Sequence, residues 1–225
     1  MTSDPSSAPA DLNHYLRPIE RVADGWVHLA GVAGAAVGGL VLLGLALGMG
    51  SAGLTAAVGV YVACLLLMFL VSAAYNLGGP RWRDLFMRLD QAAIFLMIAG
   101  SYTPFTTQRL TGAWAWGLSL TVWTVALVSA ACKVLAPNLG NRVWVGVYLA
   151  LGWLVVVALQ PLMATVSFWA LGLLLAGGVV YSLGVLVYLR ETLPFRSAIW
   201  HGFVTAAAAM HFVAILTGVV LVART

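Results

Sequence analysis

The sequence predicts an all-α membrane protein with seven transmembrane helices, a cytoplasmic N-terminus and a C-terminus outside. Of the 225 residues, 62% are hydrophobic and only 8% are charged, whereas soluble domains carry about 25% charged residues. Residues 29–80 and 143–189 contain no Asp, Glu, Lys or Arg, and a spanning helix needs roughly 20 such apolar residues. The Lys and Arg residues gather at the ends of the apolar stretches.

Turn signals divide the apolar stretches into elements. Residues 1–17, rich in Ser, Pro, Ala and Asp, are expected to form a disordered tail, followed by one transmembrane domain over residues 18–225. Gly-rich segments separate the first helices, Pro104 is expected to bend the third near its end, and Gln160-Pro161 is expected to separate the fifth from the sixth. The helices are predicted at about 24–47, 54–77, 88–107, 112–134, 142–159, 165–189 and 197–222.

The predicted orientation depends on the distribution of basic residues. With seven spans, one side carries Arg17, Arg21, Arg81, Arg83, Arg88, Lys133, Arg142, Arg190 and Arg196, and the other side carries Arg109 and Arg224. Short cytoplasmic loops are enriched in Lys and Arg, so the N-terminus is expected in the cytoplasm. The net charge is +4, but the basic residues lie at the ends of apolar stretches, where they contact lipid headgroups and set the topology. This placement argues against a nucleic-acid partner. Membrane lipids are the expected partners, and the sequence indicates no particular protein partner.

Ionisable residues inside the predicted spans are candidates for function because burying them in hydrocarbon is costly. Glu20 and Asp24 are expected near the headgroups and His28 near the inner end of the first helix, while His211 is expected to hydrogen-bond between helices. A second group falls at one depth, near the cytoplasmic ends of the second, third and seventh helices. Its members, expected to form one polar cluster, are Ser72, Asn76, Asp90, Ser197 and His201.

Several motifs resemble the hemolysin III branch of the progestin and adipoQ receptor family. These are Glu20-x3-Asp24-x3-His28-x2-Gly31, Ser72-Ala-Ala-Tyr75-Asn76, the stretch from Leu89-Asp90 to Pro104, and Ala198-Ile-Trp-His201 followed by His211-Phe212. The resemblance covers nearly the whole chain after the tail. It implies seven helices, a cytoplasmic N-terminus and, for a bacterial member, a location in the plasma membrane.

The resemblance also implies a zinc ion near the cytoplasmic surface, held by three histidines with a Ser and an Asp in support. Ser72 and Asp90 match the supporting pair and are the candidate catalytic residues, and His201 matches one ligand. The other two ligand positions hold Asn76 and Ser197, which offer only neutral oxygen atoms, so zinc binding is not favoured and no cofactor is assigned. A reduced site using His201, Asp90 and His28 is an alternative.

Three functions remain open at this stage. The favoured one is a non-catalytic membrane protein that acts in membrane homeostasis or lipid sensing through the polar cluster. A zinc-dependent hydrolase of lipid amides or esters is the enzymatic alternative, with a metal-bound water as nucleophile. A pore or transporter is the third, although the only candidate groups for a pathway are Asp90, His201 and His211.

Overall fold

The computed structural model describes residues 15–135 and 141–224, and every regular element within these ranges is helical. A 3₁₀ turn (Pro80–Trp82) precedes the third long helix, a 3₁₀ segment (Trp153–Ala158) joins α5 to α6, and π and 3₁₀ turns (Leu216–Val220, Leu221–Arg224) extend α8. The α-helices are α1 (Pro18–Gly48), α2 (Ala52–Leu77), α3 (Arg83–Gln108), α4 (Gly112–Leu135), α5 (Asn141–Gly152), α6 (Leu159–Met163), α7 (Phe168–Tyr188) and α8 (Arg196–Ile215).

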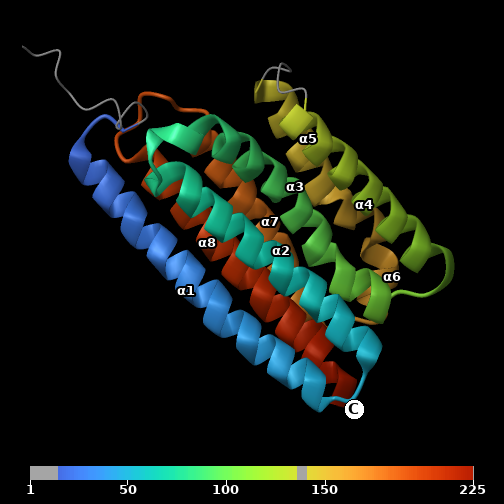
Figure 1. Cartoon of the computed structure of the whole chain (residues 1–225). Coiled ribbons are helices and arrows are strands. Elements are labelled where there is room, and N and C mark those ends of the chain that lie inside the picture. Colours follow the sequence, from blue (N-terminus) through green and yellow to red (C-terminus); the bar gives the residue numbers. More distant parts are fainter. Residues whose placement is uncertain (1–14, 136–140, 225) are drawn as a thin grey trace, which may run out of the picture.

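The long helices form a closed bundle (Figure 1). Helices α1 to α4 lie side by side in chain order, and α7 and α8 lie behind them. Helix α8 also packs against α1, which closes one side of the bundle. By contrast, α5 makes only sparse contacts with α3, α4 and α7. This loose packing leaves space between α5 and its neighbours inside the bundle.

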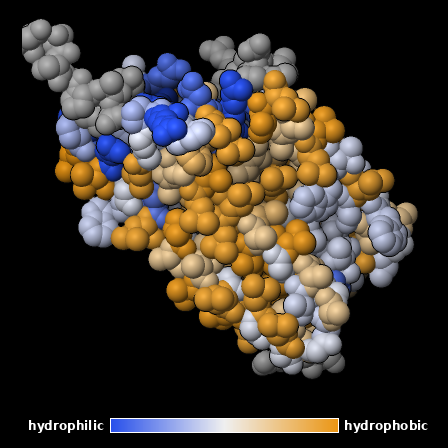
Figure 2. Space-filling model, in the orientation of Figure 1, coloured by the Kyte–Doolittle hydropathy of each residue, from blue (hydrophilic) through white to orange (hydrophobic). Residues whose placement is uncertain are grey.

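Within the described residues, six helical segments are long and apolar enough to cross a membrane, by length and composition. They are α1, α2, α4, the combined α5–α6 segment, α7 and α8 with its extension. Hydrophobic residues cover much of the visible face along the helices, and hydrophilic residues gather at one end (Figure 2). The remaining long helix, α3, has 26 residues and lies between α2 and α4.

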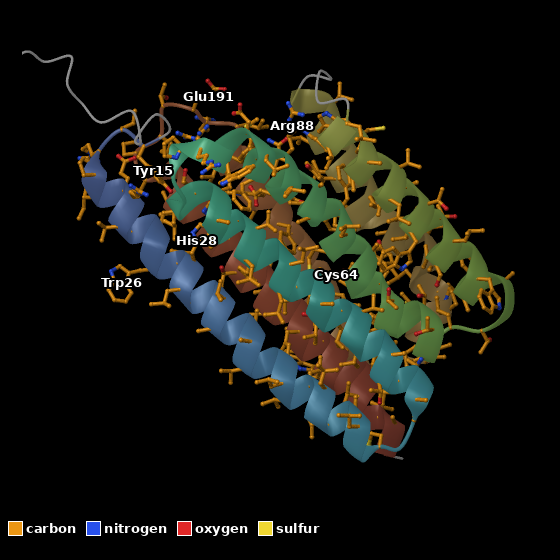
Figure 3. The ribbon with its side chains drawn as sticks, in the orientation of Figure 1. Tyr15, Trp26, His28, Cys64, Arg88 and Glu191 are labelled. Atoms are coloured by element: carbon orange, nitrogen blue, oxygen red, sulfur yellow. The ribbon has the colours of Figure 1, made fainter. Side chains whose placement is uncertain are left out.

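One end of the bundle holds the start of α1 and the connections α2–α3 and α7–α8 (Figure 1); we call it the polar end. Tyr15, Arg88 and Glu191 lie there, and His28 lies further along α1 (Figure 3). Trp26 points away from the bundle (Figure 3). The predicted polar cluster belongs to this end, because α2 finishes there and α3 and α8 begin there.

Helix α1 begins at Pro18, earlier than the predicted start at residue 24. A proline is favoured in the first turn because its fixed backbone angle suits a helix and its missing N–H would have no partner there. The predicted tail lies largely outside the described residues, namely at 1–14. Its last three residues are described, and Tyr15 among them is buried against the bundle.

The fifth and sixth spans are separated between Met163 and Phe168, and not at Gln160-Pro161 as predicted. Pro161 lies inside α6, and within the fifth span the first α-helix ends at Gly152. Because Pro161 is the third residue of α6, its missing N–H falls in the first turn, where amides have no intrahelical partner. The hydroxyl of Tyr102 accepts a hydrogen bond from the Val155 N–H at 2.6 Å and donates one to the Gly152 carbonyl at 3.0 Å. These two hydrogen bonds stabilise the 3₁₀ segment.

Helix α1 faces α2 with a stripe of small and polar residues that points into the bundle. The buried positions of α1 are Glu20, Asp24, His28, Gly31, Ala35, Gly39, Leu42 and Ala46, spaced by three or four residues as one helix face requires. A methyl group at Gly31 would lie 2.5 Å from the Phe69 ring, so the two helices approach closely there. The same face therefore carries Asp24 and His28 against α2 and α8.

Candidate functional site

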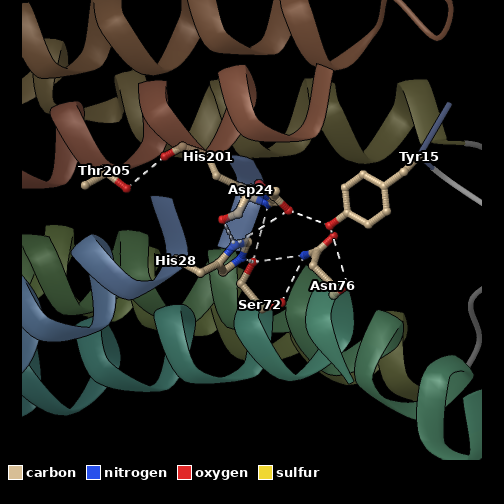
Figure 4. A network of polar contacts seen from close by, with 7 residues as sticks. All are labelled: Tyr15, Asp24, His28, Ser72, Asn76, His201 and Thr205. Atoms are coloured by element: carbon tan, nitrogen blue, oxygen red, sulfur yellow. Dashed lines mark hydrogen bonds and ion pairs between the residues drawn. The ribbon is translucent and has the colours of Figure 1, made fainter. Parts of the chain in front are cut away.

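A network of polar side chains joins α1, α2 and α8 near the polar end (Figure 4). Asp24 and His28 come from α1, Ser72 and Asn76 from α2, and His201 from α8. Tyr15 reaches the network from the segment before α1 (Figure 4). We call these six residues the buried cluster. They are all buried, and Asp24 is 0% exposed, so their polar groups must satisfy one another.

The carboxylate of Asp24 is the centre of the buried cluster. Its Oδ1 atom lies 2.6 Å from His201 Nδ1, and its Oδ2 atom accepts a hydrogen bond of 2.6 Å from the Tyr15 hydroxyl. These lengths are typical of hydrogen bonds to an ionised group. A carboxylate oxygen accepts, so we assign a hydrogen to Nδ1 of His201.

The two histidines present the same ring nitrogen to one hydroxyl. His28 Nδ1 lies 2.9 Å from the carbonyl oxygen of Asp24, which places a hydrogen on that nitrogen too. The Nε2 atoms of His28 and His201 then face the Ser72 hydroxyl, at 3.2 and 3.5 Å. The ring centroids are 4.3 Å apart. The Asp90 side chain also hydrogen-bonds Ser72, so the hydroxyl can donate its one proton to only one of these three acceptors at a time.

Asn76 and Tyr15 close the buried cluster on the side of the polar end. The amide nitrogen of Asn76 donates to the Ser72 carbonyl at 2.9 Å and lies 3.4 Å from the Ser72 hydroxyl. The Tyr15 hydroxyl also lies 3.4 Å from the Asn76 carbonyl. Burial, followed by the hydrogen bond to Asp24, raises the pKa of Tyr15 above its ordinary value, so this phenol remains a donor.

A cavity of ≈ 1160 Å³ opens beside the buried cluster. Tyr15, Asn76 and His201 of the cluster line it, as do Asp90 and Ser197. Much of the remaining wall comes from apolar and aromatic side chains of α3, α5 and α7, including Ile94, Met97, Ile98, Leu149, Tyr181 and Val185. The cavity therefore has a group of polar side chains at one end and a mainly apolar wall further into the bundle, which also includes Ser101, Ser182 and His211.

The predicted cluster is brought together in part. Ser72, Asn76 and His201 belong to the buried cluster. Asp90 lines the cavity, and its carboxylate accepts a hydrogen bond from Ser72 and interacts electrostatically with His201 and Asp24. Ser197 is half-buried in the cavity wall.

Glu20 and Asp24 lie within α1, whereas the first helix was expected to begin at about residue 24. Both are buried, because α1 begins earlier and turns this face inward, and their expected depth near the headgroups stays a prediction. Glu20 accepts from Arg17 Nε at 3.2 Å. Further along α8, His211 makes the expected interhelical hydrogen bond, with Nε2 3.2 Å from the Leu174 carbonyl. The central role of Asp24 and the participation of Tyr15 were not foreseen.

The zinc ion that the family resemblance implies does not fit the buried cluster as its side chains stand. Asp24, His28 and His201 each bring a ligand atom, all within 4.8 Å of one another, and a histidine and carboxylate donor set suits zinc. Two ligands of one tetrahedral zinc, however, lie about 3.3 Å apart, given metal–ligand bonds of about 2.0–2.1 Å. The Asp24 Oδ1 to His201 Nδ1 distance of 2.6 Å is that of a hydrogen bond between the two residues.

The comparisons with known proteins confirm the resemblance. A family model described as "Haemolysin-III related" matches residues 18–212. "Hemolysin-3" from Bacillus cereus is 38% identical over 168 residues, covering 74% of this chain and 77% of the relative. "Hemolysin-3 homolog" from Bacillus subtilis (strain 168) is 32% identical over 198 residues, covering 88% and 93%.

A human relative also matches: "Monocyte to macrophage differentiation factor" is 28% identical over 165 residues, covering 69% of this chain and 67% of the relative. The six apolar helices and the Bacillus relatives together support an integral protein of the plasma membrane. The chain belongs to the haemolysin-III-related family of membrane proteins.

Proposed function

We propose that this protein binds a membrane lipid in its internal cavity and acts in membrane homeostasis through that binding. The observation that carries the proposal is the cavity of ≈ 1160 Å³ with the buried cluster at one end. Drug-sized ligands occupy pockets of about 300–1,000 Å³, so the space suits a larger amphiphile. Its apolar wall matches an acyl chain, and its polar end matches a headgroup.

The dimensions of the cavity agree with this occupant. His201 and His211 both line it and are ten residues apart on one helix, which is about 15 Å by helical rise. Glu191 and Arg196 also line the cavity, from the α7–α8 connection and the start of α8 at the polar end. A polar or charged headgroup at that end could remain in contact with water. A lipid chain that enters from the bilayer exchanges one apolar environment for another, so burial alone contributes little. Packing against this wall and polar contacts with the cluster would hold the lipid.

We further propose seven transmembrane crossings with the N-terminus in the cytoplasm. Helix α3 has 26 residues, about 39 Å of helix, whereas the hydrocarbon core is about 30 Å thick. It runs between α2 and α4, both apolar enough to span, so its polar residues are shielded from lipid. Arg17, Arg81 and Arg190 lie at the polar end, and the positive-inside rule puts that end in the cytoplasm.

The lipid proposal is tested by blocking the cavity. Ile98 lines the cavity, so Ile98→Trp fills part of the space, whereas Leu120→Trp places the same ring on a site of α4 that is 71% exposed. Lipid that remains with the detergent-purified protein is extracted and quantified by mass spectrometry. We expect about one tightly held lipid per chain in the parent and in Leu120→Trp, and at least a fivefold loss in Ile98→Trp. Equal lipid content in both variants, with both folded, contradicts the proposal.

A further inference from the structure

A lysine is buried beside the cavity without an acidic partner. Lys133, in the last turn of α4, is 4% exposed, and its Nζ atom donates to Gln91 Oε1 at 2.6 Å. The ammonium also lies 5.0 Å from the centroid of the Trp144 ring, which is a cation–π distance. Among the described residues Lys133 forms no ion pair, and residues 136–140, which follow α4, contain no Asp or Glu. An amide and an aromatic ring, instead of a carboxylate, therefore compensate this charge within the described residues.

Gln91 carries the effect of this charge to the cavity. Its side-chain oxygen accepts from Lys133, which assigns the two amide hydrogens to the other side-chain atom, Nε2. Gln91 lines the cavity, and its Nε2 atom makes no hydrogen bond to any described residue and is not enclosed by protein atoms. Because a hydrogen bond from a cation polarises the amide, its N–H groups become stronger donors. Gln91 therefore presents two donors to the cavity with a positive charge behind them, an arrangement that favours an anion.

Asp90, the preceding residue, supplies the opposite charge at the same depth. It lines the cavity, its carboxylate hydrogen-bonds Ser72 of α2, and it forms no ion pair with any described residue. Consecutive Cα atoms are about 3.8 Å apart, and successive side chains of a helix are turned by about 100°. Asp90 is thus directed toward α2 while Gln91 is directed toward Lys133 of α4. A ligand in the cavity meets a carboxylate on one side and amide donors on the other.

We propose that the headgroup of the bound lipid is a phosphoethanolamine-like zwitterion, whose phosphate accepts from Gln91 and whose primary ammonium donates to Asp90. The inference rests on the lipid binding proposed above and specifies the headgroup. Two carbon atoms join the phosphate ester to the amine in such a headgroup, so its two charges reach neighbouring side chains of one helix. The acyl chains then follow α3 past Met97 and Ile98, which line the cavity deeper in the bundle.

The charge balance of the cavity distinguishes this headgroup from others. Asp90, Glu191 and Arg196 line the cavity, and Lys133 behind Gln91 brings the balance to two acidic and two basic residues. An anionic headgroup adds a negative charge that has no counter-charge left, and charges interact strongly in a medium of low dielectric. A diacylglycerol leaves both sides without a charged partner. A choline headgroup keeps both charges but has no N–H to donate to the carboxylate, so it should bind more weakly.

Native mass spectrometry of the full-length, detergent-purified protein tests the headgroup. The protein is offered an equimolar mixture of phosphatidylethanolamine, phosphatidylcholine, phosphatidylglycerol and diacylglycerol with the same acyl chains. We expect the parent to bind phosphatidylethanolamine at least tenfold more than phosphatidylglycerol or diacylglycerol, and at least threefold more than phosphatidylcholine. Binding of all four lipids within a factor of two overturns the headgroup assignment.

Asp90→Asn tests the contact with the ammonium. The variant removes one negative charge and keeps the shape of the side chain, so the ratio of bound phosphatidylethanolamine to phosphatidylglycerol should fall at least fivefold. Asp84→Asn is the matched control, because Asp84 is exposed in the first turn of α3 and does not line the cavity, and it should keep the parent ratio. A merely structural role of Asp90 beside Ser72 lowers binding of both lipids equally. An unchanged ratio in Asp90→Asn therefore overturns the assignment.

Gln91→Met tests the contact with the phosphate. Methionine has a similar length but no amide, so the ratio of bound phosphatidylethanolamine to diacylglycerol should fall at least fivefold. Gln108→Met, at the opposite end of α3 and away from the cavity, should keep the parent ratio. If Gln91→Met also keeps it, the phosphate does not bind at Gln91 and the assignment is wrong.

The headgroup ratios are measured independently of whether any lipid is bound. If Ile98→Trp lowers the lipid content as proposed while the ratios do not depend on Asp90 or Gln91, the lipid-binding cavity stands and the headgroup assignment fails. If the parent binds none of the four lipids, both proposals fail.

Discussion

Asp24 and His201 are 177 positions apart in the chain and meet in a buried hydrogen bond of 2.6 Å between Oδ1 and Nδ1. The contact ties α1 to α8 at the polar end, and the same carboxylate binds Tyr15 through its other oxygen. The geometry of the whole buried cluster therefore depends on one fully buried carboxylate.

Replacing Asp24 is expected to destabilise the protein. Asp24→Leu leaves the His201 Nδ1–H buried without its acceptor and the Tyr15 hydroxyl with only its 3.4 Å contact to the Asn76 carbonyl, and losing a hydrogen bond to a buried charged group costs about 1.5–3 kcal/mol. Asp24→Asn, which keeps one acceptor oxygen, should cost less. Thermal unfolding in detergent measures the effect. Asp84→Leu is the control, because Asp84 is exposed in the first turn of α3 and contributes at most about 1 kcal/mol there. Equal losses at the two positions would refute the central role of Asp24.

The Tyr15 hydroxyl is expected to contribute to stability, whereas that of Tyr61 is not. Tyr15→Phe removes the donor to Asp24, and a hydrogen bond to a charged group is worth about 1.5–3 kcal/mol. Tyr61 is fully buried, and its hydroxyl has no hydrogen-bond partner among the described residues, so Tyr61→Phe should be neutral or stabilising. Unfolding midpoints of the two variants compare them directly. A Tyr15→Phe variant as stable as the parent would show that this segment does not hold the cluster.

The close approach of α1 and α2 predicts opposite outcomes for two glycines three residues apart. A methyl group at Gly31 would lie 2.5 Å from the Phe69 ring, whereas one at Gly34 would meet nothing within 4 Å. Gly31→Ala should destabilise by about 1–3 kcal/mol through overpacking. Gly34→Ala should be neutral or gain up to about 1 kcal/mol from helix propensity. Unfolding in mixed detergent micelles separates the two, and the reverse order would show that α1 has a different register.

Reporter fusions test the topology around α3. A phosphatase reporter that is active only outside the cytoplasm should be inactive after Gly79 and active after Thr111, because α3 lies between these positions. A fusion after residue 191 should be inactive, since the α7–α8 connection lies at the proposed cytoplasmic end. The same activity after Gly79 and Thr111 would mean that α3 does not cross.

Much of the helical architecture could be predicted from hydropathy and turn residues, because bilayer thickness imposes long apolar runs. The depth of Ser72, Asn76 and His201 followed from the order of the helices. The participation of Asp24 did not, because hydropathy does not show where a helix begins outside its apolar core. The spacing of Asp24, His28, Gly31 and Ala35 on one face of α1 is the signal that predicts it.

Other features leave no trace in the local sequence. Tyr15 is a single aromatic residue in a polar segment, and only its long-range contact with Asp24 explains its burial. The end of regular α-helix at Gly152 depends on the Tyr102 hydroxyl, 50 residues earlier in the chain. Such contacts between distant residues arise only in the folded bundle.

Photo-crosslinking in membranes tests the lipid-binding cavity most directly. Cells or vesicles containing the protein are loaded with a diazirine-bearing acyl lipid, irradiated, and the modified residues are mapped by mass spectrometry. We predict adducts on cavity-lining residues of α3 and α7, such as Ile94, Met97 and Tyr181, that decrease in the Ile98→Trp variant. Adducts confined to outward-facing residues such as Leu120 and Leu186, unchanged by that variant, would contradict a lipid inside the bundle.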